Sequence, residues 1–134
     1  MNIDRPDARP SRRGSPDWFT GTVWVDELLP AAEPARLHVL RVSFEPGART
    51  AWHTHPLGQV LHILSGTGRV QRQGEAPAEV HAGDTVWFAP GERHWHGAAP
   101  GQTMVHLAIQ QTTADGNEVT WQEHVTSADY GRQP

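Results

Sequence analysis

The sequence contains no cysteine in its 134 residues, so disulfide bonds and thiol chemistry are excluded and any metal site must use nitrogen and oxygen ligands. No apolar run is long enough to span a membrane, and residues 1–15 lack the apolar core of a secretory signal. The basic residues form no long run and the formal net charge is −4, which argues against nucleic acid or a membrane surface as a partner. We therefore expect a cytoplasmic protein.

The chain also lacks any convincing helical period of 3.6 residues. Short β-branched and aromatic runs alternate instead with Gly or Pro turns at roughly eight-to-twelve-residue spacing. This pattern is typical of an all-β sandwich or barrel. The length fits one domain, which we place at residues 17–134, after a flexible N-terminal arm at residues 1–16 that is rich in Arg, Pro and Asp.

β-Branched and aromatic content between turn residues predicts the positions of the strands. The predicted strands are 18–25, 35–45, 49–55, 58–64, 68–73, 78–81, 85–89, 94–96, 103–110 and 118–125. Segments 58–64 and 68–73 are expected to form a hairpin, and the proline-containing segment 26–34 is expected to form a loop. Residues 127–130 are expected to form one helical turn, with Ser127 as its cap.

Two pairs of histidines, each pair two residues apart, indicate a metal site. In a strand, side chains at i and i+2 point to the same face, so His53 and His55 can converge on one point, with Gln59 a few residues on. A second segment offers His94 and His96 after a Pro-Gly turn. One such pair can arise by chance, but two pairs on neighbouring hairpins favour a common centre. Imidazole and amide ligands suit a divalent ion, and we interpret His53, His55, Gln59 and His94 as its ligands.

These two segments resemble the motifs of the cupin family. The first follows the pattern Gly-x5-His-x-His-x3-Glu-x6-Gly, and the second follows Gly-x5-Pro-x-Gly-x2-His-x3-Asn. The positions that fit are Gly47, His53, His55, Gly66, Gly83, Gly91 and His94. Three positions depart from the family pattern: Gln59 stands in place of Glu, Ala89 in place of Pro and Ala98 in place of Asn.

Nearly all of the chain after Asp17 is similar to the small bacterial cupins that include manganese-dependent (R)-selective hydroxynitrile lyases. That group holds its metal with three His and one Gln, so the departure at Gln59 agrees with it. The resemblance implies a double-stranded β-helix, also called a jelly-roll barrel. It also implies a divalent metal, with Mn²⁺ favoured over Fe²⁺ or Zn²⁺, and reversible cleavage of cyanohydrins such as mandelonitrile to an aldehyde and cyanide.

Such a reaction needs a group that takes the hydroxyl proton and returns a proton to cyanide. His96 shares a strand face with His94, and we predict it as this acid and base, although it could instead pack at the rim. The resemblance places His106 and Gln110 on the pocket face of their strand, across from Leu40 and Val42. We predict His106 as a second catalytic residue, with a buried supporting histidine as the alternative, and Leu40, Val42 and Gln110 as the substrate pocket.

Two other functions remain open from the sequence. The same ligands with open positions would allow an iron-dependent oxygenase that cleaves an alkene or a diketone, and a cupin pocket can also bind a metal or small ligand without catalysis. For either enzyme the partner is a small-molecule substrate. Segment 18–25 is too apolar to stay exposed at a sheet edge, so we also expect a homo-oligomer, a dimer or a dimer of dimers.

Overall fold

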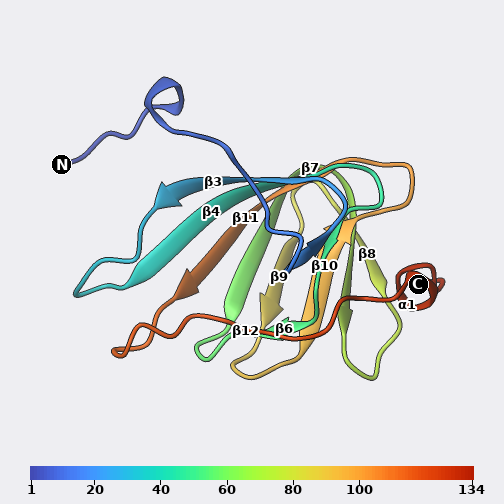
Figure 1. Ribbon diagram of the computed structural model, residues 1–134. Helices are drawn as coiled ribbons and strands as arrows, with labels where there is room; N and C mark the ends of the chain where they lie inside the picture. Colours follow the sequence, from blue (N-terminus) through green and yellow to red (C-terminus); the bar gives the residue numbers. More distant parts are fainter.

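Two layers of antiparallel strands curl over each other in the computed structural model, which describes residues 1–134 (Figure 1). In chain order the elements are η1 (Pro6–Ala8), β1 (Arg12–Arg13), β2 (Phe19–Thr20), β3 (Val23–Leu29), β4 (Leu37–Phe44), β5 (Arg49–Thr50), β6 (His53–Thr54), β7 (Gln59–Arg72), β8 (Ala78–His81), β9 (Thr85–Phe88), β10 (His94–Ala98), β11 (Met104–Gln111), β12 (Thr120–Trp121) and α1 (Ser127–Tyr130). The predicted all-β fold is confirmed. None of its helices has the length and hydrophobicity needed to cross a bilayer.

Strand β7 belongs to both layers. Its first half pairs with β11 and β9, in the layer that continues through β4 and β3 to β1. Its second half pairs with β10 and β8, in the layer that continues through β5 to β2, with β6 and β12 attached to β10. The two layers therefore share one long strand and face each other across the interior.

The hairpin predicted around residues 65–68 is wrong, because β7 runs unbroken through this segment. Gly66 has a positive φ of 78°, and a Cβ there would lie 1.9 Å from the carbonyl oxygen of Thr103. Glycine is required at this point because the strand bends closely past β11. The chain passes from one layer to the other here instead of reversing.

The main core fills the space between the layers. Along β7, Leu61 and Ile63 are buried, while His62 between them faces outward and is hydrogen-bonded to the hydroxyl of Thr85. The same alternation buries Val42 and Phe44 on β4, so the inner faces supply a continuous apolar interior. At one end of this interior the apolar residues give way to histidines.

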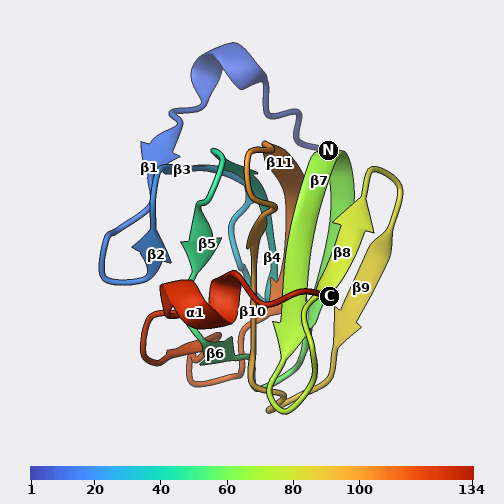
Figure 2. The ribbon, with the colours of Figure 1, turned by 90° about the vertical axis from the view of Figure 1, so that its right-hand side faces the viewer.

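A second, smaller core lies on the outer side of β10, where α1 packs (Figure 2). Trp95 is fully buried there with Tyr130, whose hydroxyl donates to the carbonyl oxygen of Ala98 at 2.7 Å. The helical turn at 127–130 is confirmed, but its cap is Thr126, whose hydroxyl accepts from the backbone N–H of Asp129. Trp95 thus points away from the histidines that flank it.

Three further strand boundaries differ from the sequence prediction. Gly21, with φ of 81°, separates β2 from β3, and β3 continues into the expected loop because it pairs with β4 on one side. The segment predicted at 49–55 is divided into β5 and β6, which pair with different parts of β10. The segment predicted at 118–125 is a strand only at β12, where it pairs with β6.

The N-terminal segment crosses one edge of the first layer. Arg12 and Arg13 pair with Val25 and Trp24 as strand β1, and the backbone N–H of Gly14 donates to the carbonyl oxygen of Val23. This places residues 12–15 beside the open end of the interior.

Candidate metal centre and pocket

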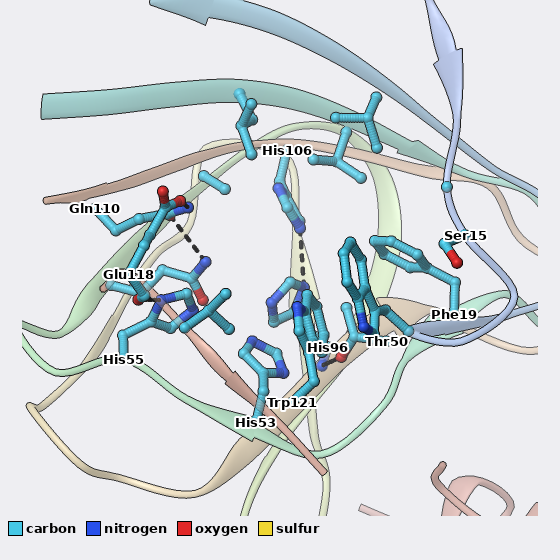
Figure 3. Close-up of a pocket in the computed structure, with 18 of the residues that line it drawn as sticks. Ser15, Phe19, Thr50, His53, His55, His96, His106, Gln110, Glu118 and Trp121 are labelled. Atoms are coloured by element: carbon cyan, nitrogen blue, oxygen red, sulfur yellow. Dashed lines mark hydrogen bonds between the residues drawn. The ribbon is translucent and has the colours of Figure 1, made fainter. Parts of the chain in front are cut away.

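A cavity of about 410 Å³ opens between the two layers, a size that suits a small organic ligand. Side chains from β4, β6, β7, β10 and β11 reach into it, together with the loop before β12 (Figure 3). One wall is apolar and the other is formed by histidine and glutamine. The cavity therefore has an apolar side and a polar side, and the polar side carries the candidate metal ligands.

Three of the predicted ligands are buried imidazoles whose outer nitrogen is held by a backbone carbonyl. The contacts are His53 Nδ1 to Ala51 O at 2.9 Å, His55 Nδ1 to Glu118 O at 2.9 Å and His94 Nδ1 to Glu92 O at 2.8 Å. A carbonyl oxygen only accepts, so each Nδ1 carries the proton and each Nε2 keeps a free lone pair. Metal-binding histidines are fixed in this way.

The amide of Gln59, buried at the start of β7, completes the predicted set. Its Nε2 donates to Oε1 of Gln110 at 3.1 Å, and Nε2 of Gln110 donates to the Glu118 carboxylate at 2.6 Å. Gln59 Oε1 therefore faces inward, 3.1 Å from Nε2 of His94. Two acceptor atoms meet at this distance, and His55 Nε2 is buried without a partner. A cation between these lone pairs satisfies all of them, so the residues present fit a metal ion.

Burial keeps these imidazoles neutral, the form that binds metal. Loss of solvent lowers the pKa of His53 well below its ordinary value and lowers the pKa of His94 to about 4. The pKa of His55 is also lowered, again chiefly by burial. His94 is fixed further by Phe88, which stacks on it with ring centroids 3.7 Å apart. The site is thus rigid and uncharged.

The two predicted catalytic residues form a buried pair. Nδ1 of His96 and Nε2 of His106 lie 3.0 Å apart, and one proton is shared between them as a hydrogen bond (Figure 3). His96 Nε2 and His106 Nδ1 have no hydrogen-bond partner. Burial lowers the pKa of His106 to about 3 and lowers that of His96 as well. Neither ring is fixed by a backbone carbonyl of another residue, which distinguishes this pair from the three imidazoles above.

His96 also lies close to the ligands. One ring nitrogen from each of His53, His94 and His96 falls within 4.8 Å of the other two, so these three histidines could hold a metal ion. The sequence prediction paired His94 with His53 and His55 instead. The structure brings all four histidines into one cluster, with His53 and His94 common to both groupings.

The three predicted pocket residues line the cavity. Leu40 and Val42 on β4 lie opposite Ala108 and His106 on β11, and Gln110 follows on the same face of β11. Phe19 and Trp121 add aromatic surface that the sequence prediction did not assign to the pocket. They come from short strands, β2 and β12, whose partners lie far away in the sequence.

A third group that the sequence prediction missed joins the pocket to the surface. His38 is half-buried and lies between Glu118 at 2.7 Å and Glu27 at 2.8 Å. Its hydrogen bond to Glu118 is the main reason that its pKa is raised. Burial alone would raise the pKa of Glu118, but its bonds to His38 and Gln110 lower it, so Glu118 is a carboxylate.

Comparisons with known proteins find a matching family, a similar relative and similar folds. The model of the family described as "Cupin domain" matches residues 40–109. A relative from Granulicella tundricola named "(R)-mandelonitrile lyase" is 56% identical over 98% of this chain and 100% of its own.

Solved structures show the same fold. A cupin-like protein from Thermotoga maritima is similar with a TM-score of 0.83 and 41% identity, covering 88% of this chain and 89% of its own. A polyketide cyclase from Streptomyces resistomycificus has a TM-score of 0.71 over 97% of this chain and 89% of its own, but at 18% identity it shows the fold alone.

Proposed function

The chain belongs to the cupin family, and from that premise we propose that it is a metal-dependent hydroxynitrile lyase. The reaction is the reversible cleavage of a cyanohydrin such as mandelonitrile to an aldehyde and cyanide. The observation that carries the proposal is the full-length similarity, at 56% identity, to a relative named (R)-mandelonitrile lyase. A buried histidine cluster that could hold a metal ion lies beside an apolar cavity, which supports a metal-dependent reaction on a small organic substrate.

We assign the metal to His53, His55, Gln59 and His94, and we propose Mn²⁺, with Fe²⁺ or Zn²⁺ as the alternatives. The support is the set of four inward lone pairs described above, three of them fixed by carbonyls and one by Gln110. When bound, a divalent cation acts as a Lewis acid that polarises the cyanohydrin oxygen. All four ligands are neutral, so the protein leaves the charge of the cation undiminished.

The His96–His106 pair is proposed to move the proton. Cleavage removes the proton from the cyanohydrin hydroxyl, breaks the bond between the carbinol carbon and the nitrile carbon, and delivers a proton to cyanide. A ring nitrogen without a partner can accept the first proton, and the 3.0 Å contact between the rings lets the pair hold it as one unit. The same pair then returns a proton to cyanide, so no proton is gained or lost overall.

The apolar wall holds the organic part of the substrate and excludes water. Leu40, Val42 and Ala108 cover one side, and Trp121 and Phe19 present aromatic rings on another. An aryl group such as that of mandelonitrile can pack on these rings. Gln110 lines the cavity and is hydrogen-bonded to Gln59, so its side chain lies at the boundary between the apolar wall and the polar cluster.

The test measures benzaldehyde release from mandelonitrile together with the metal content of the purified protein. We expect cleavage that is lost on metal removal and restored by Mn²⁺. A matched oxygen-electrode assay with the iron-loaded protein addresses the oxygenase alternative. A fully metallated protein that releases no benzaldehyde above the buffer rate would contradict the proposal.

Assembly and location are also part of the proposal. Trp24 on β3 and Trp87 on β9 are exposed by 40% and 57%, and Trp is enriched at interfaces between protein chains. We propose that such surfaces are covered in a homo-oligomer, a dimer or a dimer of dimers. A cytoplasmic location stays a prediction.

A further inference from the structure

A chain of hydrogen bonds runs from the surface to the amide of Gln59. At the surface, the side chain of His38 is hydrogen-bonded to Glu27 on one side and to Glu118 on the other. Further in, Gln110 is hydrogen-bonded to Glu118 and to Gln59. Gln110 and Glu118 lie together at one side of the pocket (Figure 3). Only Gln59 belongs to the proposed ligand set. The side chains of the outer members therefore reach the proposed ligands by hydrogen bonds only through this amide, while the backbone carbonyl of Glu118 separately accepts from Nδ1 of His55.

The chain has a fixed direction because a carboxylate can only accept hydrogen bonds. Glu118 accepts from Gln110 Nε2 at 2.6 Å, so the oxygen of Gln110 must face Gln59. That oxygen accepts from Gln59 Nε2 at 3.1 Å, so the oxygen of Gln59 must face the histidines. Each amide orientation is thus set by the one before it.

We propose that Glu118 is a positioning residue that selects the amide orientation of Gln59 in which Oε1 faces the metal. This inference rests on the proposed ligand set. Glu118 is not itself a ligand, since its side chain contacts His38 and Gln110.

The opposite orientation is a real competitor when no metal is bound. Gln59 Oε1 and His94 Nε2 then face each other as two acceptors 3.1 Å apart. If the amide of Gln59 were reversed, its N–H would donate to that lone pair and this contact would be satisfied without a cation. Reversal requires Gln110 to turn as well, and that would set its oxygen against the Glu118 carboxylate. Glu118 therefore opposes the reversed state.

The variant Glu118→Gln tests this directly, because a glutamine fits the same space and can also donate. The introduced amide could donate to Gln110, Gln110 to Gln59 and Gln59 to His94, which completes the reversed chain. We expect the Mn²⁺ affinity of the metal-free protein to fall about tenfold, the lower end for a residue that supports a metal ligand. The affinity is measured by calorimetric titration and by the electron paramagnetic resonance signal of free Mn²⁺.

The loss of a negative charge near the cation could also weaken binding, so the same change is repeated in a Gln59→Glu background. A carboxylate at position 59 has no N–H and presents an oxygen to the metal in either orientation. We expect Glu118→Gln to have less than about a twofold effect there, whereas a simple charge effect would persist. The matched control is Glu27→Gln, which removes the same charge from the outer side of His38 and should also change affinity less than about twofold. An equal loss in both backgrounds would overturn the inference.

Two further variants keep the test decisive. Gln110→Leu removes the acceptor next to Gln59 and should weaken Mn²⁺ binding to a similar extent, even if Glu118→Gln does not fold. Gln59→Ala tests the ligand set itself. If Gln59→Ala binds Mn²⁺ as tightly as the parent, both the ligand assignment and this inference are overturned. If Gln59→Ala weakens binding and Glu118→Gln does not, the positioning role alone is overturned.

Discussion

Replacing His94 by alanine tests whether a buried imidazole in this pocket binds metal. His94 is fully buried on β10 and stacks on Phe88 with ring centroids 3.7 Å apart and planes 10° apart. Removing the ring has two separable effects. It leaves a cavity, which lowers the free energy of unfolding by about 2–4 kcal/mol with or without metal. It also removes a ligand, and this second effect appears only when metal is present.

The metal-dependent part can be given a size. A ligand at one hundred times its dissociation constant stabilises the folded state by about 2.7 kcal/mol. Unfolding entropy is about 2.1 cal/mol/K per residue, which for 134 residues amounts to about 0.28 kcal/mol/K. Saturating Mn²⁺ should therefore raise the melting temperature of the parent protein by about 10 °C, and that of His94→Ala by far less.

The assay is scanning calorimetry on protein stripped of metal, with and without added Mn²⁺, beside elemental analysis of the same samples. His81→Ala is the matched control, because His81 is exposed on β8 and its side chain pairs only with Glu79. The control should keep the full Mn²⁺-dependent rise. If His94→Ala kept both its metal content and the full rise in melting temperature, His94 would not be a ligand.

Three other predictions follow from the site. Gln59→Glu should keep or gain metal affinity, because opposite charge is added, yet it should cleave mandelonitrile more slowly, because that charge reduces the Lewis acidity of the cation. Metal content and cleavage rate are measured on one preparation, and equal turnover at full metal content would refute this prediction. His106→Gln should keep its metal content but lose about 10²-fold or more in cleavage rate, and a near-normal rate would exclude His106 from proton transfer. His38 has a raised pKa, so its stabilising contribution is complete below its ordinary value of 6.5 and is lost as the pH rises through the raised value. In urea titrations His38→Gln should therefore lower the free energy of unfolding most below pH 6.5, and a deficit that does not change with pH would contradict this.

The sequence allowed the histidine cluster to be predicted because strand geometry and the turn before His94 relate its members. Side chains two residues apart in a strand share a face, so His53 and His55 were expected to converge, and their ring centroids lie 5.1 Å apart. The turn that carries His94 opposite His53 was also readable from Pro90 and Gly91. In the structure His94 and His53 are register partners of neighbouring strands.

Strand β7 shows where local reasoning fails. Ser65 and Gly66 permit a turn, and nothing nearby in the sequence distinguishes a reversal from a bend. The outcome is decided by pairing with distant strands, because β11 pairs with the first half of β7 in one layer and β10 pairs with its second half in the other. A prediction from turn residues alone therefore placed a hairpin where the fold has its longest continuous strand.

The pair His38 and Glu118 was unpredictable for a related reason. The two residues are 80 positions apart, and Glu118 lies in a loop where the sequence predicted the start of a strand. A single histidine on a half-exposed strand is most simply read as solvated. Only the folded chain shows that its ring lies between two carboxylates.

The position of Glu118 bears on how the neutral Gln59 could serve as the proposed ligand. The cupin motif has Glu at this position, where a carboxylate bound to the metal would aid binding but neutralise part of the cation's charge. Here a carboxylate is present two hydrogen bonds further out, separated from the ligand oxygen by the amides of Gln110 and Gln59. Coulomb attraction falls with distance and with the polarisable groups between, so Glu118 draws much less on the charge of the cation than a direct ligand would. Because it still fixes the direction of both amides, the site can retain an oriented oxygen ligand and a cation of full Lewis acidity together.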